Sequence, residues 1–146
     1  TALFGLREQV TARKALPVIN AAYNGLQMWD GRATGRFVDP VTNTVAIPQG
    51  GSLESQASGP PLNTIEMAHA GTTWAELAGK VAQVRPLALA TNLPAALDTW
   101  IGARSYPQLF QEAFGDTNVS ARRILFAIAT YERTLVSNQA PIDAFR

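Results

Sequence analysis

The clearest hydrophobic pattern lies near the C-terminal end of the chain. Between residues 120 and 137, apolar side chains recur at the spacing of an α-helix, at Ile124, Ile128, Tyr131 and Leu135. Ser120 stands directly before this run, and serine is a preferred N-cap residue. The pattern predicts a long amphipathic helix over 120–137 with these side chains on its apolar face.

A second helix is predicted just upstream, between Ser105 and Gly115. Ser105 suits the N-cap, and Pro107 falls in the first turn, where its missing N–H leaves no hydrogen bond unmade. Gly115 can take the left-handed conformation that ends many helices. The side chains expected to bury one side are Leu109, Phe110, Ala113 and Phe114. The two C-terminal elements therefore form a helix–turn–helix pair.

Weaker patterns predict three further helices. One begins at Thr72 or Thr73 and runs to about Val84. A short one is indicated where Asn63 precedes Glu66 by three residues, which is capping-box spacing. Another short helix is expected over Pro17 to Tyr23.

Turn-forming residues dominate the remaining central stretches. Residues 30–52 and the Gly-Pro-Pro sequence at 59–61 are rich in Gly, Pro, Asp and Asn. We expect loops there, with one short extended pair between Arg36–Val38 and Thr44–Ile47. The predicted fold class is mainly α with long loops, and 146 residues suffice for one domain or a large piece of one.

Composition and charge exclude several functional classes. The chain has 12 Lys and Arg against 11 Asp and Glu, and no basic cluster longer than Arg122-Arg123, so nucleic-acid binding is not expected. No apolar run approaches the roughly 20 residues that span a bilayer, and no N-terminal targeting signal is evident. With no cysteine, the chain itself cannot form a disulfide, a zinc–thiolate site or the thioether links of a C-x-x-C-H haem motif.

The only histidine, His69, offers little chemistry. It follows Glu66 by three residues, as in the E-x-x-H ligand motif of di-iron helical bundles. Such a site needs a second E-x-x-H, which the chain lacks. A Ser-His-Asp hydrolase is equally unsupported, because there is no G-x-S-x-G motif. We expect His69 to face solvent or to bond to the backbone, and we expect no metal site in this segment.

Six sequence blocks carry the functional signal. In chain order they are Lys14–Asn24 (KALPVINAAYN), Met28–Ala33 (MWDGRA), Ser52–Pro60 (SLESQASGP), Asn63–Met67 (NTIEM), Leu109–Gly115 (LFQEAFG) and Tyr131–Ser137 (YERTLVS). In this order they resemble the region between the two C-x-x-C-H motifs of di-haem cytochrome c peroxidases, including the MauG-like kind. The resemblance covers nearly the whole chain.

The resemblance implies roles for individual side chains. Trp29 matches the tryptophan between the two haems of this family, which is held to conduct electrons; without the neighbouring blocks it reads as a core aromatic. Gln56 and Glu66 match the pair on the distal side of the peroxidatic haem. There Glu66 moves a proton between the two peroxide oxygens, and Gln56 holds peroxide or water by hydrogen bonds. Gln56 also reads as an exposed helix residue, and Glu66 as part of the capping box.

Other residues receive weaker assignments. Asp30 and Arg32 can pair with each other, or Arg32 can bind a haem propionate as a cofactor-binding residue. We interpret Tyr131, Glu132 and Arg133 as structural residues that anchor the long helix.

The chain also departs from the family pattern. Lys14 stands where relatives usually have an asparagine of an interdomain calcium site, and an ammonium group cannot ligate a cation, so calcium is doubtful. Residues 1–13 contain no histidine to cap the peroxidatic haem. The loop between Trp29 and Gln56 and the segment from about Val84 to Arg104 are longer than usual, which commonly alters access to a site.

The resemblance implies a cytochrome-c-like helical portion of a two-domain, periplasmic di-haem protein. Residues 1–146 would be one segment of it, with the helix over 120–137 leading toward the second haem domain. Two c-type haems are expected, attached through cysteines outside this chain. The protein would reduce peroxide, or use peroxide or oxygen to oxidise a substrate. Its partners would be a small cytochrome, a copper protein or an oxidisable substrate, and a homodimer stays open. The alternative is a haemless helical module that retains the scaffold for protein contacts.

Overall fold

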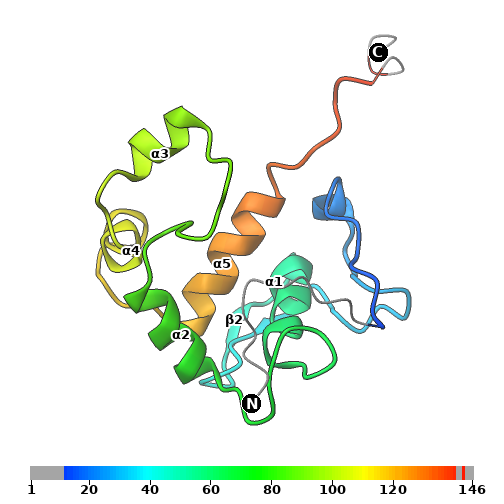
Figure 1. The fold of residues 1–146 in the computed structure, drawn as a ribbon. Helices are drawn as coiled ribbons and strands as arrows, with labels where there is room; N and C mark the ends of the chain where they lie inside the picture. Colours follow the sequence, from blue (N-terminus) through cyan, green and yellow to red (C-terminus); the bar gives the residue numbers. More distant parts are fainter. Residues whose placement is uncertain (1–11, 141–142, 144–146) are drawn as a thin grey trace.

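The computed structural model describes residues 12–140 and residue 143, and within them the chain is mainly helical (Figure 1). The α-helices are α1 (Ser52–Ala57), α2 (Trp74–Gln83), α3 (Ala95–Ile101), α4 (Tyr106–Phe114) and α5 (Ala121–Glu132). Two 3-10 helices, η1 (Ala21–Tyr23) and η2 (Pro60–Leu62), accompany an antiparallel pair of short strands, β1 (Phe37–Val38) and β2 (Val45–Ile47). The predicted mainly α class and the predicted strand pair are confirmed.

Helix α5 forms the centre of the packing. It contacts α1 on one side and α2 on another, while the β1–β2 hairpin packs against α1 (Figure 1). The main core cluster consists of Phe37, Ala57, Trp74, Ala121 and Leu125. A smaller cluster of Ala21, Leu53 and Ala129 joins the N-terminal segment to α1 and α5. Segments far apart in the sequence therefore meet along α5.

The buried face of α5 differs from the predicted one. The residues that α5 buries are Ala121, Leu125 and Ala129, whereas Ile128 and Tyr131 are exposed. Ala121 and Ala129 have small side chains that let neighbouring elements approach the helix closely. A hydrophobicity pattern favours the larger side chains one position away, so the predicted face was wrong by about one residue.

Helix α5 is also shorter than predicted. Ser120 caps its N-terminus as expected, but the helix ends at Glu132 instead of residue 137. After Glu132 the chain forms hydrogen bonds with Asn20 instead of continuing the helix. The Asn20 N–H donates to the Leu135 carbonyl (2.8 Å), and the Ser137 N–H donates to Asn20 Oδ1 (2.9 Å). These contacts, 115 residues or more apart in sequence, compete with continuation of the helix.

Helices α2 and α4 confirm two predictions. Thr73 caps α2, whose C-cap is Val84. Ser105 and Gln108 form a capping box at the start of α4, and Gly115 ends it at φ 87°. Of the four apolar side chains predicted to be buried in α4, only Phe110 is fully buried. Leu109 and Phe114 are half-buried, and Ala113 is exposed.

Three local predictions were wrong or incomplete. No helix follows Asn63, because the N–H groups of Glu66, Met67 and Ala68 all donate to the Asn63 carbonyl and close a turn instead. The predicted helix over Pro17 to Tyr23 is reduced to η1, since Asn20 adopts the left-handed conformation (φ 63°). The Gly-Pro-Pro stretch predicted as a loop begins η2.

Candidate functional site: two adjoining cavities

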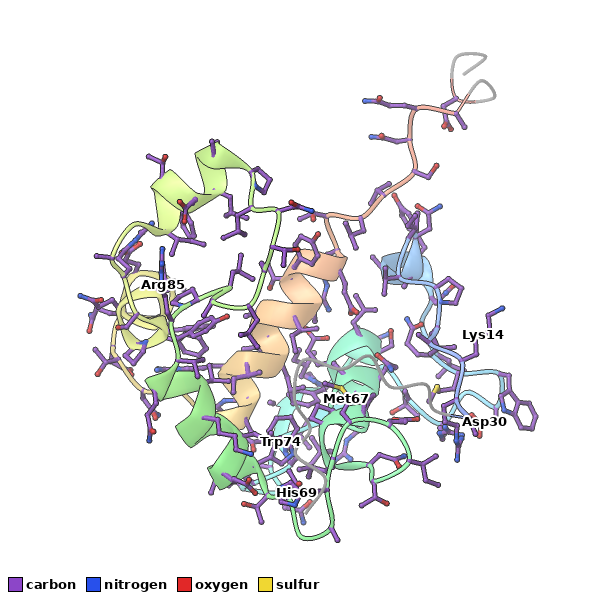
Figure 2. The ribbon with its side chains drawn as sticks, viewed as in Figure 1. Lys14, Asp30, Met67, His69, Trp74 and Arg85 are labelled. Carbon is purple, nitrogen blue, oxygen red and sulfur yellow. The ribbon has the colours of Figure 1, made fainter. Side chains whose placement is uncertain are left out.

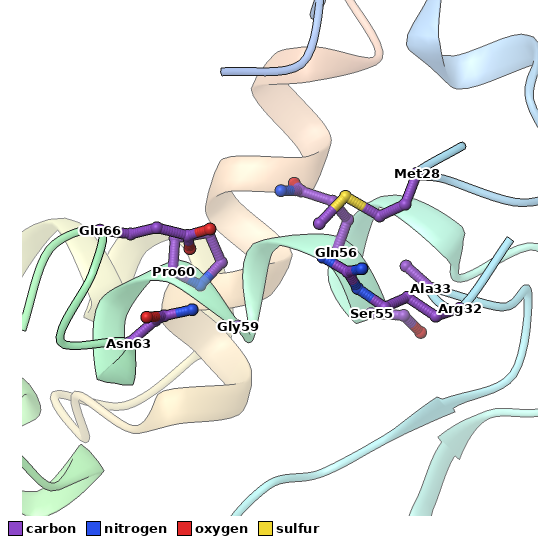
Figure 3. A pocket seen from close by; sticks show the side chains of 9 residues that line it. All are labelled: Met28, Arg32, Ala33, Ser55, Gln56, Gly59, Pro60, Asn63 and Glu66. Atoms are coloured by element: carbon purple, nitrogen blue, oxygen red, sulfur yellow. The ribbon is translucent and has the colours of Figure 1, made fainter. Parts of the chain in front are cut away.

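Two cavities share one wall on the side of the molecule formed by α1 and the loops around it. The smaller has a volume of about 270 Å³ and the larger about 460 Å³. Side chains that line both are Met28, Arg32, Gln56, Pro60 and Glu66. In Figure 3 the side chains of Gln56 and Glu66 extend toward the centre of the smaller cavity from α1 and from the turn after η2. The structure therefore brings together the two residues predicted as catalytic.

Helix α1 positions Gln56, and its N-terminal end is packed very closely. A Cβ atom built on Gly51 would lie 2.8 Å from Phe37 Cβ and 3.2 Å from Ile47 Cβ. Only glycine therefore fits where the hairpin meets the start of α1. The helix then buries Ser52, Leu53, Glu54 and Ala57, which leaves Gln56 half-buried at the cavity wall.

An ion pair fixes α1 to the end of α5. Glu54 is only 3% exposed, and its two carboxylate oxygens accept hydrogen bonds from Arg133 Nη1 (2.7 Å) and Nη2 (2.9 Å). Arg133 Nη2 also donates to the Gly50 carbonyl (3.2 Å). The hydrogen bond to Glu54 is the main reason that the pKa of Arg133 is raised. Arg133 therefore joins the end of α5 to α1 within this chain.

The turn that carries Glu66 is organised by Asn63. Asn63 Oδ1 accepts a hydrogen bond from the Ile65 N–H (2.9 Å), and the Asn63 carbonyl accepts the N–H of Glu66 (3.0 Å). Glu66 is half-buried on this turn and faces both cavities. It is therefore not the partner of Asn63 in a capping box.

Trp29 lies on a short closed loop at the larger cavity. The Gln27 N–H donates to the Ala33 carbonyl (2.8 Å) and closes the loop at its base, while Met28 and Gly31 take positive φ values of 72° and 68°. The buried Gln27 amide ties this loop to α1 by donating to Ser52 Oγ (3.2 Å). Trp29 itself is 95% exposed, so the interpretation as a core aromatic is wrong.

Asp30 and Arg32 pair with each other on the same loop. Arg32 Nη1 lies 3.0 Å from Asp30 Oδ2, and the Arg32 N–H donates to Asp30 Oδ1 (3.2 Å). Desolvation raises the pKa of Asp30, but the hydrogen bonds from Arg32 outweigh it and leave the pKa below its usual value. Arg32 lines both cavities, where its guanidinium can also meet an anionic group.

The N-terminal segment forms the opposite wall of the larger cavity. Its lining side chains there are Arg13, Lys14, Ala15, Leu16, Pro17 and Val18. Lys14 lies on the same side of the molecule as Asp30 (Figure 2). The wall is thus apolar over Ala15–Val18 and cationic at its start.

Glu132 is a cavity residue that sequence reasoning placed in a structural role. It lines the larger cavity, and its Oε2 atom is enclosed with no hydrogen-bond partner among the described residues. Burial raises its pKa; the Arg133 charge lowers it and the Glu54 charge raises it further. The neighbouring Tyr131 is exposed rather than packed. No local pattern in the sequence signals this position, because the predicted apolar face of α5 was wrong by about one residue.

His69 belongs to neither cavity. Its Nδ1 lies 2.9 Å from the Ala70 carbonyl and its Nε2 lies 3.1 Å from Glu76 Oε1. These two hydrogen bonds raise the pKa of His69. The prediction of an exposed, backbone-bonded histidine is confirmed. Within residues 12–140 and 143 there is no group of three potential metal-ligating His, Asp or Glu side chains. Nor is any helix in this part of the chain long and apolar enough to cross a membrane.

The class of protein follows from a comparison with known families. A helical chain whose cavity wall presents the paired Gln56 and Glu66 matches the family model described as di-haem cytochrome c peroxidase over residues 2–146. The chain belongs to this family, which confirms the resemblance drawn from the six sequence blocks.

The relatives to which the chain is similar include a MauG protein and two cytochrome c peroxidases. Over 90% of its length the chain is 33% identical to methylamine utilization protein MauG of Methylophilus methylotrophus. Over 86% it is 28% identical to cytochrome c peroxidase Ccp of Escherichia coli, and over 98% it is 29% identical to cytochrome c551 peroxidase of Nitrosomonas europaea. The chain spans 28%, 19% and 31% of these three proteins, respectively.

Proposed function

We propose that this chain supplies the peroxide-binding side of the active site in a longer di-haem oxidoreductase. The observation that carries the proposal is the shared cavity wall formed by Gln56 and Glu66. Family membership supports haem-dependent redox chemistry. The proposed reaction is the reduction of peroxide, or the use of peroxide or oxygen to oxidise a substrate.

The residues around the larger cavity fit one face of a haem. The wall over Ala15–Val18, together with Leu53 and Met28, offers apolar contacts to a porphyrin, and Arg32 offers a guanidinium to a propionate. The enclosed, unpartnered Oε2 of Glu132 is a further sign that a group belongs in this space. The chain has no cysteine, so the proposal includes two c-type haems attached through cysteines elsewhere in the intact protein.

When bound, haem supplies the electron transfer to peroxide, and the side chains supply the proton movements. Glu66 Oε would take a proton from one peroxide oxygen and return it to the other, which would leave as water. Gln56 holds peroxide through its amide, which neither gains nor loses a proton at working pH. Half-burial beside Pro60 limits water around both groups.

Trp29 and Arg32 complete the proposed roles. An exposed indole at the cavity rim is available to a second domain, which is what electron transfer between two haems requires. Arg32, held by Asp30, binds a propionate. By family resemblance the proposal extends to a periplasmic location. It also extends to an external electron donor such as a small cytochrome or a copper protein, or else an oxidisable substrate.

The test uses the intact protein produced with cytochrome c maturation. We expect a Soret band from covalent haem, and Glu66→Gln should slow peroxide turnover about 100-fold or more while haem content stays unchanged. Glu112→Gln is the control, because Glu112 lies on α4 in an exposed ion pair with Arg104. Absence of covalent haem would favour the haemless interaction module, and normal turnover in Glu66→Gln would remove its proposed role.

A further inference from the structure

Glu132 combines two properties that a structural carboxylate rarely has together. It lines the larger cavity, which Glu66 also lines, and its Oε2 is enclosed without a hydrogen-bond partner among the described residues. Buried polar atoms are normally paired, so an unpaired carboxylate oxygen indicates either a proton or a bound group at that atom.

The hydrogen bonds of the neighbouring guanidinium go to groups other than Glu132. Arg133 follows it directly, but the Arg133 guanidinium is committed to both oxygens of Glu54 on α1 and to the Gly50 carbonyl. The other charged side chains around the larger cavity are Arg13, Lys14, Arg32 and Glu66. Of these, Arg32 pairs with Asp30. Burial raises the pKa of Glu132 above its usual value, the Arg133 charge lowers it in part, and the Glu54 charge adds to the rise. The protonated form is therefore favoured to a higher pH than in a free glutamic acid.

We propose that Glu132 is a proton-relay residue that transfers protons from solvent to the Glu66 side of the cavity during turnover. The inference rests on the proposed function and adds the route of the protons that the reaction consumes. Glu132 acts through Glu66 and through water in the cavity, without contact to peroxide.

Proton balance gives the reason for a second carboxylate. Reduction of one hydrogen peroxide to two waters consumes two electrons and two protons. Glu66 only moves a proton between the two oxygens of peroxide, so it supplies none. The electrons come from the external donor. At Glu132 an O–H bond to Oε2 breaks as the proton leaves toward the cavity, and it forms again when a proton arrives from solvent.

The test distinguishes the role of Glu132 from that of Glu66 and uses the intact, haem-loaded protein. Stopped-flow mixing with peroxide alone gives a first phase that needs no net proton; adding the reduced electron donor gives a second phase that consumes protons. In Glu132→Gln we expect a normal first phase and a second phase slowed about tenfold, since water can partly replace a relay. The wild-type second phase should slow as pH rises through the pKa of Glu132, and this dependence should vanish in the variant. Glu132→Asp, which keeps a carboxyl group, should restore part of the rate.

An infrared titration gives a readout independent of activity. The wild-type protein should show a protonated-carboxyl band that titrates above the usual range of glutamic acid and is absent in Glu132→Gln but present in Glu112→Gln. A missing band, or an unchanged second phase and pH profile in a folded Glu132→Gln protein, would overturn the relay. A normal first phase in Glu66→Gln would instead contradict the proposed function, so the two failures are distinguishable.

Discussion

Glu54 and Arg133 lie 79 residues apart in the sequence and meet in a two-point ion pair that joins α1 to the end of α5. Both elements carry cavity residues, Gln56 on α1 and Glu132 on α5. The pair therefore links the two elements that carry these cavity residues.

Arg133→Leu should destabilise the protein by about 3 kcal/mol, because it leaves the buried Glu54 carboxylate without a partner. This value lies at the low end for buried pairs, since the Arg133 side chain is 37% exposed and water screens it in part. Urea unfolding of the intact protein measures the change. Arg85→Leu is the matched control: its ion pair with Asp98 is exposed on both sides, and the loss should be much smaller. Equal losses in the two variants would contradict the role of the buried pair.

Gly51→Ala should lower the free energy of unfolding by about 1–3 kcal/mol, because the new methyl group would collide with Phe37 and Ile47. The φ of Gly51 is −96°, so the cost reflects packing rather than backbone strain. Gly79→Ala is the control within α2, where nothing lies within 4 Å of the added atom and alanine favours the helix by roughly 0.5–1 kcal/mol. The unfolding temperature should fall for Gly51→Ala and rise for Gly79→Ala. A stable Gly51→Ala protein would show that the hairpin can move away from α1.

Trp29→Phe should leave the absorption spectrum of each haem unchanged and slow electron transfer between them, because phenylalanine is much harder to oxidise than tryptophan. Since Trp29 is 95% exposed, the substitution should hardly change the unfolding temperature. Flash reduction followed by absorbance of the two haems measures the transfer. Trp100→Phe is the control, since Trp100 lies on α3 against Arg104. Normal transfer in Trp29→Phe would exclude the electron-transfer role.

The carboxyl group of Asp116 should titrate at about 2, because hydrogen bonds from Arg123 and from the Asn118 N–H stabilise its charged form. A lowered pKa contributes stability above the ordinary value of 3.8, and that contribution is lost as pH falls through the folded-state pKa. NMR titration measures the pKa directly. In Arg123→Gln it should move back toward 3.8; a pKa that stays near 2 would assign the effect to the Asn118 N–H.

The sequence predicted elements whose signals are local. The capping box of Ser105 with Gln108, the stop at Gly115 and the Thr73 cap depend on neighbours within a few residues, and all three appear in the structure. The end of α5 depends on Asn20, far away in the sequence, and no local pattern reveals this. Helix α3 escaped prediction because it buries only Ile101 and lacks a side-chain cap.

The candidate site shows the same division. Family blocks identified Gln56 and Glu66, and the structure places both at one cavity wall. The environment of Glu132 could not be predicted, because it depends on the partner with which Arg133 forms its ion pair. That partner is Glu54, a buried residue that a hydrophobicity pattern would not place in the interior.

The two walls of the larger cavity differ in how firmly they are held. One wall belongs to α1 and α5, which are joined by core packing and by the ion pair of Glu54. The other, residues 13–18, has no regular secondary structure and is mostly exposed. Backbone amides of such a segment exchange with solvent through small local openings, whereas those of the packed helices exchange only through larger ones. A local opening of the larger cavity on the side of residues 13–18 would therefore leave the hydrophobic core around α5 intact.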